Sequence, residues 1–350
     1  MRILIVRLSA MGDIIHAMPA VAGLRAAFPE SRIDWAIEER WSPLLRARPS
    51  GTDDDVLLSA EQPLVNLVHR VHMRRWRRAP FSHSTHEEIR ALRTRLRALN
   101  YDHVIDLQGA IRSALLAQAS GAKVRTGALH PREFAARWWY NVKAHTPARH
   151  VVDQAAETVS AAIGRGIDPS PPPFPIAADA ERWADDLLAP SSRPFAIINP
   201  GAGWGAKCWP AERYRALVRT LGEHGIDTFV NAGPGEVGLA EAVVRGNESC
   251  ARVLQCSLLQ LIAVTRRAAL VIGGDTGPVH LASALEIPVI AIFGPTDPLR
   301  NGPYGGRYVV LRSPHSKRDH SRRREPEPGL LSITIEQVSE AALALLGVPA

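Results

Sequence analysis

The sequence has few cysteines and no long apolar run. Its three cysteines, Cys208, Cys250 and Cys256, form no CxxC pair, which argues against a disulfide framework and a zinc site and favours a reducing compartment. Nowhere do about 18 uninterrupted apolar residues occur, so we expect no helix that spans a bilayer. The N-terminal stretch is similar to a secretion signal, but Arg7 and Asp13 interrupt its apolar run. We therefore interpret it as a first strand and helix.

The composition is that of a folded protein. Apolar residues make up 46% of the chain and charged residues 22%, which excludes an intrinsically disordered chain. The length of 350 residues leaves room for two domains of about 150 residues each. With 42 basic and 35 acidic residues the net charge is +7. This surplus attracts nucleic acids, membrane surfaces and phosphorylated substrates alike, so charge alone does not choose among them.

A strand, a loop and a helix follow one another repeatedly in the first half. Residues 2–7 form an apolar strand, and a glycine-containing loop leads into a helix that extends through Phe28. A second strand is predicted at 33–37, and a further strand and helix at 101–119. The basic passage at 70–82 is less regular, and we assign it to loops. This order predicts an α/β domain with a parallel sheet.

A proline-rich stretch divides the chain. Residues 169–176 include SPPPFP, which suits neither a helix nor a central strand, so we interpret them as a linker. The strand and helix order then begins again. We expect one Rossmann-like domain at 1–168, a second at 177–330 and a C-terminal amphipathic helix within 331–350. The charged stretch at 313–329 is predicted to be an exposed loop.

The loop after the strand that begins at Val271 is the strongest candidate binding site. It reads GGDTGP, and Pro278 stands near the first position of a helix, where its missing N–H costs nothing. Such a turn directs backbone N–H groups and the positive end of the helix dipole toward one point, which suits a phosphate. Thr276 and Gly277 would add a hydroxyl and a close backbone. The next strand, 289–293, ends at the same sheet edge, where ligands of open α/β sheets bind.

Lys207 ends a second glycine-rich loop, GAGWGAKCWP, after a strand at 195–199. At this position the Lys207 ammonium can pair with a bound diphosphate. Glycines in the loop, such as Gly203, allow the backbone to come close to that diphosphate. Positive groups held in a dry cleft stabilise the charge of a diphosphate well. Taken alone, Lys207 could equally be a solvated loop lysine. The matching loop at Thr276 favours the functional interpretation, in which the two loops act without a metal.

The order of these motifs resembles that of the lipopolysaccharide heptosyltransferases, and the first of these enzymes more than the second. That family is an inverting branch of the two-Rossmann-domain glycosyltransferases. The resemblance implies two domains that face each other across a cleft, with the terminal helix packing back toward the first domain. The matching motifs are DTG at 275–277 with His280, FGPTDP at 293–298, KCWP at 207–210 and RWR at 75–77.

The resemblance implies transfer of heptose from ADP-heptose to Kdo on lipid A, without a cofactor. Asp13 would be the general base that takes the proton of the acceptor hydroxyl, although a carboxylate at a helix start is also a common cap. Asp275 would bind the donor sugar or cap its helix. Glu236 would bind ribose or be a surface glutamate, and His280 would pack or form a hydrogen bond.

Arginine side chains are suited to bind an anionic acceptor, because each can form a pair of hydrogen bonds to a carboxylate or a phosphate. The alternative for each is a solvated basic loop. Because the acceptor is a lipid, we expect a cytoplasmic protein that visits the cytoplasmic face of the inner membrane through basic loops. The candidate acceptor residues are Arg74, Arg75, Arg77, Arg78 and, less directly, Arg112.

Three other functions fit parts of the pattern. Transfer to an existing heptose, as by the second heptosyltransferase, needs the same donor loops. A sugar-nucleotide epimerase on the same fold needs no lipid acceptor. A nucleic-acid-binding module would explain the basic patches, but no aromatic series beyond Trp76 accompanies them.

Overall fold

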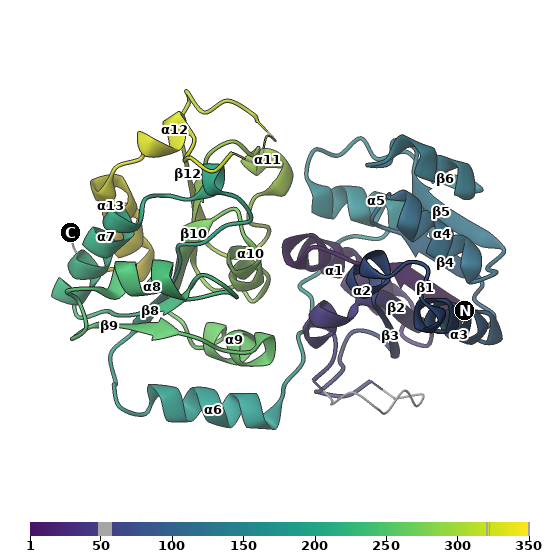
Figure 1. The fold of residues 1–350 in the computed structure, drawn as a ribbon, viewed down its shortest axis with the longest axis horizontal. Coiled ribbons are helices and arrows are strands. Elements are labelled where there is room, and N and C mark those ends of the chain that lie inside the picture. The colour runs from purple at the N-terminus through teal and green to yellow at the C-terminus, as the bar shows by residue number, and fades with distance from the viewer. Residues whose placement is uncertain (48–57, 320, 322, 349–350) are drawn as a thin grey trace. The chain divides into compact units, whose positions relative to one another are not determined.

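The computed structural model describes residues 1–47, 58–319, 321 and 323–348. The chain forms two compact units, Met1–Ala177 and Ala178–Ala350, each with its own sheet (Figure 1). The division falls directly after the predicted linker at 169–176, in which three consecutive prolines exclude regular structure.

The first unit is a parallel sheet of six strands in the order β3-β2-β1-β4-β5-β6. Helices or short helical turns connect its strands. Its elements are β1 (Arg2–Val6), α1 (Met11–Ala27), β2 (Arg32–Glu38), η1 (Glu39–Leu44), β3 (Leu67–Val71), α2 (Met73–Arg78), α3 (His83–Ala98), β4 (His103–Asp106), α4 (Ile111–Ala119), β5 (Val124–Ala128), η2 (Phe134–Trp139), β6 (Val142–Ala144) and α5 (Val151–Ile163).

The second unit is also a parallel sheet of six strands, in the order β12-β11-β10-β7-β8-β9. Its elements are α6 (Ala178–Leu188), β7 (Phe195–Asn199), η3 (Gly205–Lys207), α7 (Ala211–Glu223), β8 (Asp227–Asn231), α8 (Val237–Val244), β9 (Ala251–Leu254), α9 (Leu258–Thr265), β10 (Leu270–Gly274), α10 (Gly277–Ala284), β11 (Val289–Phe293), α11 (Pro298–Asn301), β12 (Tyr308–Arg312), α12 (Pro328–Leu331) and α13 (Ile335–Leu346).

Both sheets have the strand order of the Rossmann fold, because in each unit the first and fourth strands lie side by side at the centre. The central strands are apolar on both faces, as parallel sheets require. In β1, for example, Leu4 and Val6 join a core with side chains of α3 and α4, while Ile3 and Ile5 are equally buried on the other face. Loops that follow neighbouring strands meet at one edge, and the candidate residues lie on these loops.

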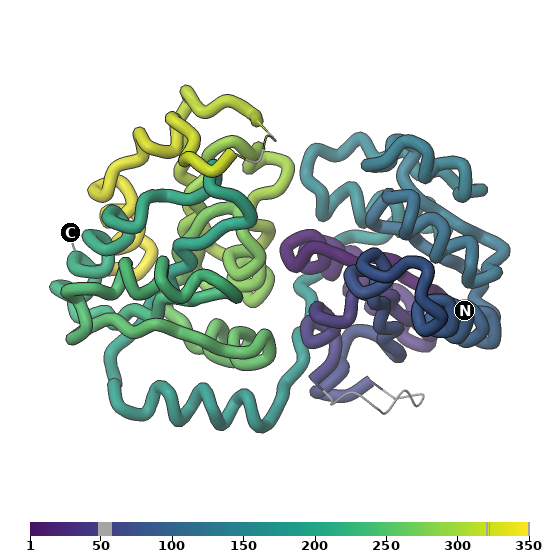
Figure 2. Tube along the Cα trace, in the orientation of Figure 1, coloured from purple at the N-terminus to yellow at the C-terminus, as the bar shows by residue number. Residues whose placement is uncertain are grey.

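The C-terminal helix α13 begins with a capping box, in which the Thr334 hydroxyl accepts the Gln337 N–H at 3.3 Å. Its buried residues Val338, Ala342 and Leu343 join the core of the second unit. The helix contacts α7 and the sheet of that unit, at the end of the trace in Figure 2. That it also packs back toward the first domain stays a prediction.

The loop prediction for the basic passage at 70–82 was wrong for most of residues 70–78 and holds for residues 79–82. The first residues of this passage complete β3 and the next form α2. Trp76 is only 8% exposed and its indole N–H donates to the Glu88 carboxylate at 2.7 Å. Glu38, at the end of β2, accepts the backbone N–H groups of Met73 and Arg74 at the start of α2. These partners are distant in sequence, so local periodicity does not reveal the helix.

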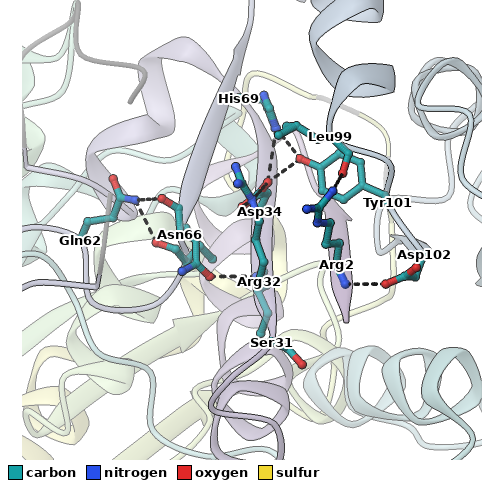
Figure 3. Close-up of polar contacts among 12 residues, drawn as sticks. Arg2, Ser31, Arg32, Asp34, Gln62, Asn66, His69, Leu99, Tyr101 and Asp102 are labelled. Atoms are coloured by element: carbon teal, nitrogen blue, oxygen red, sulfur yellow. Dashed lines mark hydrogen bonds and ion pairs between the residues drawn. The ribbon is translucent and has the colours of Figure 1, made fainter. Parts of the chain in front are cut away.

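A buried polar network joins the first half of β2 to β3 and β4 (Figure 3). The Tyr101 hydroxyl donates to Asp34 at 2.6 Å, and His69 Nε2 lies 2.7 Å from the Tyr101 oxygen. Arg32 also donates to the Asp34 carboxylate, at 2.9 Å. Burial, with the charges of Arg95 and Arg32, lowers the pKa of His69 to about 3. His69 is therefore neutral at physiological pH, and its N–H donates to Tyr101.

Protonation of His69 should destabilise the fold in acid. Its pKa is about 3 when folded and about 6.5 when unfolded, so the unfolded chain binds the extra proton below pH 6.5. Relative to a His69→Gln variant, we expect the wild type to lose about 2 kcal/mol of unfolding free energy between pH 7 and pH 5. Urea denaturation at each pH measures the difference. Parallel stability curves for the two proteins would contradict the assignment.

Candidate active site

Lys207 and Asp275 meet at the carboxyl ends of the neighbouring strands β7 and β10. The Lys207 ammonium forms an ion pair with the Asp275 carboxylate and lies 4.3 Å from the centre of the Trp204 ring. On the other side of that carboxylate, His280 Nε2 lies 3.0 Å from Oδ1. The Lys207 and Asp275 side chains are 11% and 9% exposed. The two predicted loops therefore form one site.

The Asp275 carboxylate is ionised in this site. Burial raises its pKa, but the hydrogen bond and charge of His280, together with the Lys207 ammonium, outweigh burial and hold the pKa of Asp275 well below its usual range. An ionised carboxylate only accepts hydrogen bonds, so the His280 Nε2 carries a proton. Asp275 does not cap α10, whose N-cap residue is Thr276. Its carboxylate holds Lys207, whose ammonium also donates to the Asp275 carbonyl at 3.5 Å and retains one further N–H donor.

The turn after β10 brings backbone N–H groups to the same place. Gly277 begins α10 and Pro278 follows it, as predicted. A side chain at Gly274 would place its Cβ only 3.0 Å from the Lys207 carbonyl oxygen, so glycine allows the two loops to approach. The Thr276 hydroxyl donates to the Gly274 carbonyl at 3.3 Å. The helix N-terminus and the Lys207 ammonium thus lie close together, an arrangement that suits an anion.

Glu236 reaches this site from the end of β8. Its carboxylate accepts the Gly233 N–H at 3.0 Å, and a Cβ at Gly201 would stand 2.3 Å from it. Glu236 thus lies against the loop that carries Lys207. The Asn231 amide donates to the Asn199 side-chain oxygen at 2.8 Å and joins the ends of β8 and β7. Gly203, in the same loop, is exposed.

The charged segment at 313–329 supports the Lys207 turn. The Ala206 N–H donates to the Arg323 carbonyl at 3.1 Å, and the Glu327 N–H donates to the Ala206 carbonyl at 3.2 Å. The Glu327 carboxylate accepts the Ser316 hydroxyl at 2.8 Å and caps α12 through Leu330 N–H. The described residues of this segment are largely exposed and irregular, as predicted, but some of their backbone groups pair with the Lys207 turn, which is distant in sequence.

Asp13 is the third residue of α1, at the carboxyl edge of the first sheet. Its carboxylate accepts the Ala10 N–H at 3.0 Å and pairs with the Arg7 guanidinium at 3.0 Å. Arg7 also donates to the Leu107 carbonyl after β4. Asp13 is not the N-cap residue of the alternative prediction, since that residue is Ala10, but its carboxylate accepts the N–H of this N-cap residue. The Asp13 side chain remains 42% exposed, so an incoming hydroxyl can reach it.

The arginines of α2 line a cavity of about 340 Å³ within the first unit. Four guanidinium groups and two carboxylates line it, so its net charge favours anions. Partial burial and the neighbouring Arg74 guanidinium lower the pKa of Arg40. Arg77 does not line the cavity, Arg75 pairs with Glu88 at 2.5 Å, and Arg112 lies apart on α4. The lining residues are Glu38, Glu39, Arg40, His72, Arg74, Arg75 and Arg78.

The sequence interpretation missed three residues at these edges. Arg7 directly follows β1 and Arg40 lies two residues after β2, and a basic residue so close to a strand end is the signal that could have identified them. Trp204 is the single aromatic residue in the glycine-rich loop before Lys207, which was a further signal. No local pattern marks the contact between Ala206 and Arg323.

Comparison with known proteins assigns the family. A family model for glycosyltransferase family 9 (heptosyltransferase) matches residues 89–330. Lipopolysaccharide heptosyltransferase 1 of Escherichia coli strain K12 is 32% identical over 318 residues, 90% of this chain and 94% of that protein. The chain belongs to glycosyltransferase family 9. The lipopolysaccharide heptosyltransferase 1 of Pseudomonas aeruginosa is 30% identical over 319 residues, 89% of this chain and 84% of that protein.

A solved family 9 structure shares the fold. The E. coli heptosyltransferase WaaC with ADP matches with a TM-score of 0.79 and 30% identity, and covers 99% of this chain and 100% of that one. The predicted family and the fold class of two Rossmann-like domains are therefore confirmed, and this family 9 member is a glycosyltransferase. Within the described ranges, no group of three or more His, Cys, Asp or Glu side chains could hold a metal ion. No helix in those ranges has the length and hydropathy needed to cross a bilayer.

A methyl group at Gly205 should disturb the Lys207 turn. Its Cβ would stand 1.7 Å from the Arg324 carbonyl oxygen, so one of the two backbones must move. We expect Gly205→Ala to lower the unfolding free energy by roughly 1–3 kcal/mol, the usual cost of overpacking. Gly238→Ala is the matched control, because nothing lies within 4 Å of its Cβ position in α8. Equal melting temperatures for the two variants would show that the contact is dispensable.

Proposed function

We propose that the protein transfers L-glycero-D-manno-heptose from ADP-heptose to Kdo on lipid A, with inversion at the anomeric carbon. The relatives of 30–32% identity bear the name lipopolysaccharide heptosyltransferase 1, and the matching WaaC structure contains ADP. The observation that carries the proposal is the Lys207, Asp275 and His280 cluster at the start of α10. It lies at the sheet edge where a nucleotide binds in this fold.

Lys207 and the α10 turn stabilise the leaving group. The bond between the anomeric carbon and the diphosphate breaks with its electron pair going to ADP, so negative charge grows on the terminal phosphate. A cation held in place before the reaction stabilises that charge without reorganisation. Asp275 and His280 hold the Lys207 ammonium in position, and Trp204 covers it on one side. Glu236 and Asp275 are the proposed partners of the ribose and sugar hydroxyls.

Asp13 is the proposed general base. The acceptor hydroxyl oxygen forms the new bond to the anomeric carbon and passes its proton to the Asp13 carboxylate. Arg7 and the Ala10 N–H fix the Asp13 carboxylate at the start of α1. The exposed part of this carboxylate remains accessible to the acceptor hydroxyl. Because Arg7 also holds the end of β4, it is a positioning residue for Asp13.

The cavity beneath α2 is the proposed site for the acidic groups of the acceptor. Arg74, Arg75 and Arg78 were expected to bind them, and Arg40 adds a fourth guanidinium to the cavity. We further propose that the reaction needs no metal, because Lys207 and the α10 turn supply the positive charge. The proposed location is the cytoplasmic face of the inner membrane, where the lipid acceptor is held.

The proposed function is tested with purified protein, ADP-heptose and Kdo-lipid A in detergent micelles containing EDTA. We expect ADP and heptosylated lipid in equal amounts. Absence of turnover, or turnover restored only by added metal, would contradict the proposal. An epimerised sugar formed from the donor alone would identify an epimerase. Transfer only to an acceptor that already carries heptose would identify an enzyme of the second type.

Loss of either proposed catalytic group should lower the rate of transfer. Replacement of one preorganised charge-stabilising group commonly costs about 10²–10³ in kcat, so we expect a loss of that size for Lys207→Met. For Asp13→Asn the expected loss is about 10²–10⁴. The control is Lys123→Met, which removes an exposed lysine before β5. Steady-state ADP release measures the rates, and wild-type kcat in either site variant would refute its assigned role.

Arg40→Ala should weaken acceptor binding selectively. Loss of one charge-assisted hydrogen bond corresponds to roughly a tenfold or greater rise in the KM for Kdo-lipid A. The KM for ADP-heptose should not change, because Arg40 belongs to the first unit and the nucleotide loops to the second. Arg93→Ala, on the exposed side of α3, is the control. Equal acceptor KM values for the two variants would exclude Arg40 from the site.

A further inference from the structure

The first unit exposes large apolar side chains on two neighbouring elements. On η2, Phe134 is 62% exposed and Trp138 is 72% exposed. On α4, Ile111 and Leu115 are 38% and 46% exposed and, being four residues apart, share one side of the helix. The two elements contact each other, since Ala136 of η2 packs with Ala114 of α4. These four exposed residues, Ile111, Leu115, Phe134 and Trp138, are called the η2 patch.

The η2 turn is firmly held although its aromatic side chains are exposed. Ala136 and Tyr140 are buried, at 0% and 4% exposure, and join the core beside α4. The Tyr140 hydroxyl donates to the buried Asp106 carboxylate at 2.6 Å. The Arg125 guanidinium donates to the Trp139 carbonyl at 3.0 Å. Phe134 and Trp138 are therefore presented on an anchored backbone, and exposed aromatic groups of this kind mark interaction surfaces.

The η2 patch lies in a strongly basic part of the chain. Residues 107–152 contain seven basic residues and one acidic residue, so this stretch has a net charge of +6. Its single carboxylate, Glu133, already accepts the Ile111 N–H at 2.8 Å. The Arg137 guanidinium lies 4.8 Å from the centre of the Phe134 ring, and Arg132 is exposed beside it. A partner of this surface therefore carries negative charge and accepts apolar groups.

We propose that the η2 patch binds the surface of an anionic lipid bilayer. Aromatic rings favour the boundary between headgroups and acyl chains, and arginines beside them pair with anionic headgroups. A bilayer offers anionic headgroups and an apolar interior to a patch of any shape. A protein partner would instead need carboxylates at positions that match the arginines of the patch. The proposal rests on the proposed function, because a lipid-linked acceptor is what brings this enzyme to a membrane.

Another exposed aromatic residue gives a sharp control. Phe81, between α2 and α3, is 90% exposed and follows the arginines of α2. It belongs to the basic segment through which the sequence interpretation expected membrane contact. If that segment made the contact, loss of Phe81 would matter and loss of the η2 patch would not.

The test is co-sedimentation of full-length protein with vesicles at low salt. Vesicles of phosphatidylcholine with phosphatidylglycerol should bind the wild type, and vesicles of phosphatidylcholine alone should bind it at least tenfold more weakly. The double variant Phe134→Ser, Trp138→Ser should lose at least tenfold in affinity for the anionic vesicles. Phe81→Ser should bind as the wild type does. Brominated lipid should quench the tryptophan fluorescence of the wild type more than that of Trp138→Phe.

Any of three results would overturn the proposal. Wild-type vesicle binding by the double variant, loss of binding in Phe81→Ser, or equal binding to neutral vesicles would exclude an anionic bilayer as the partner of the η2 patch. Retained melting temperature and retained kcat with acceptor in detergent micelles show that the double variant is folded and active. If the wild type binds vesicles but transfers no heptose, the proposed function fails and the binding surface stands.

Discussion

The ion pair between Asp275 and Lys207 is the interaction on which the nucleotide site depends. It joins the loops after β7 and β10, and both partners are nearly buried. An isolated charge in that position would be costly, so each partner needs the other. His280 completes the cluster by donating to the second carboxylate oxygen. The result is a fixed ammonium beside the start of α10.

Both units have the same strand order, and this order explains where their functional groups lie. In each unit the loops after the first and fourth strands meet at the centre of the sheet edge. In the first unit Arg7, after the first strand, pairs with Asp13 and donates to Leu107 after the fourth strand, and in the second unit the two loops bring Lys207 beside Asp275. A carboxylate paired with arginine marks one centre, and a lysine paired with aspartate marks the other. The same backbone plan therefore supplies one centre suited to accept a proton and one suited to hold a phosphate.

The sequence predicted those features that local patterns encode. Apolar strands, glycine-bearing turns and Pro278 at the start of α10 were sufficient to place Asp13, Lys207 and Asp275 on loops at the carboxyl edges. Features that depend on distant partners were not predictable. α2 forms because Glu38 caps it and Trp76 packs beneath it, and the segment near Glu327 is ordered by Ala206. The partners of α13 within the second unit were not predictable for the same reason, since amphipathicity shows that a helix packs against a neighbour but not against which one.

The most direct test of this account is a double-mutant cycle on ADP binding, measured by calorimetry for wild type, Lys207→Met, Asp275→Asn and the double variant. If Asp275 acts by holding Lys207, each single change should weaken ADP binding and the double variant should bind about as weakly as Lys207→Met alone. Independent, additive losses, or undiminished binding in Lys207→Met, would contradict the claim that this ion pair organises the site.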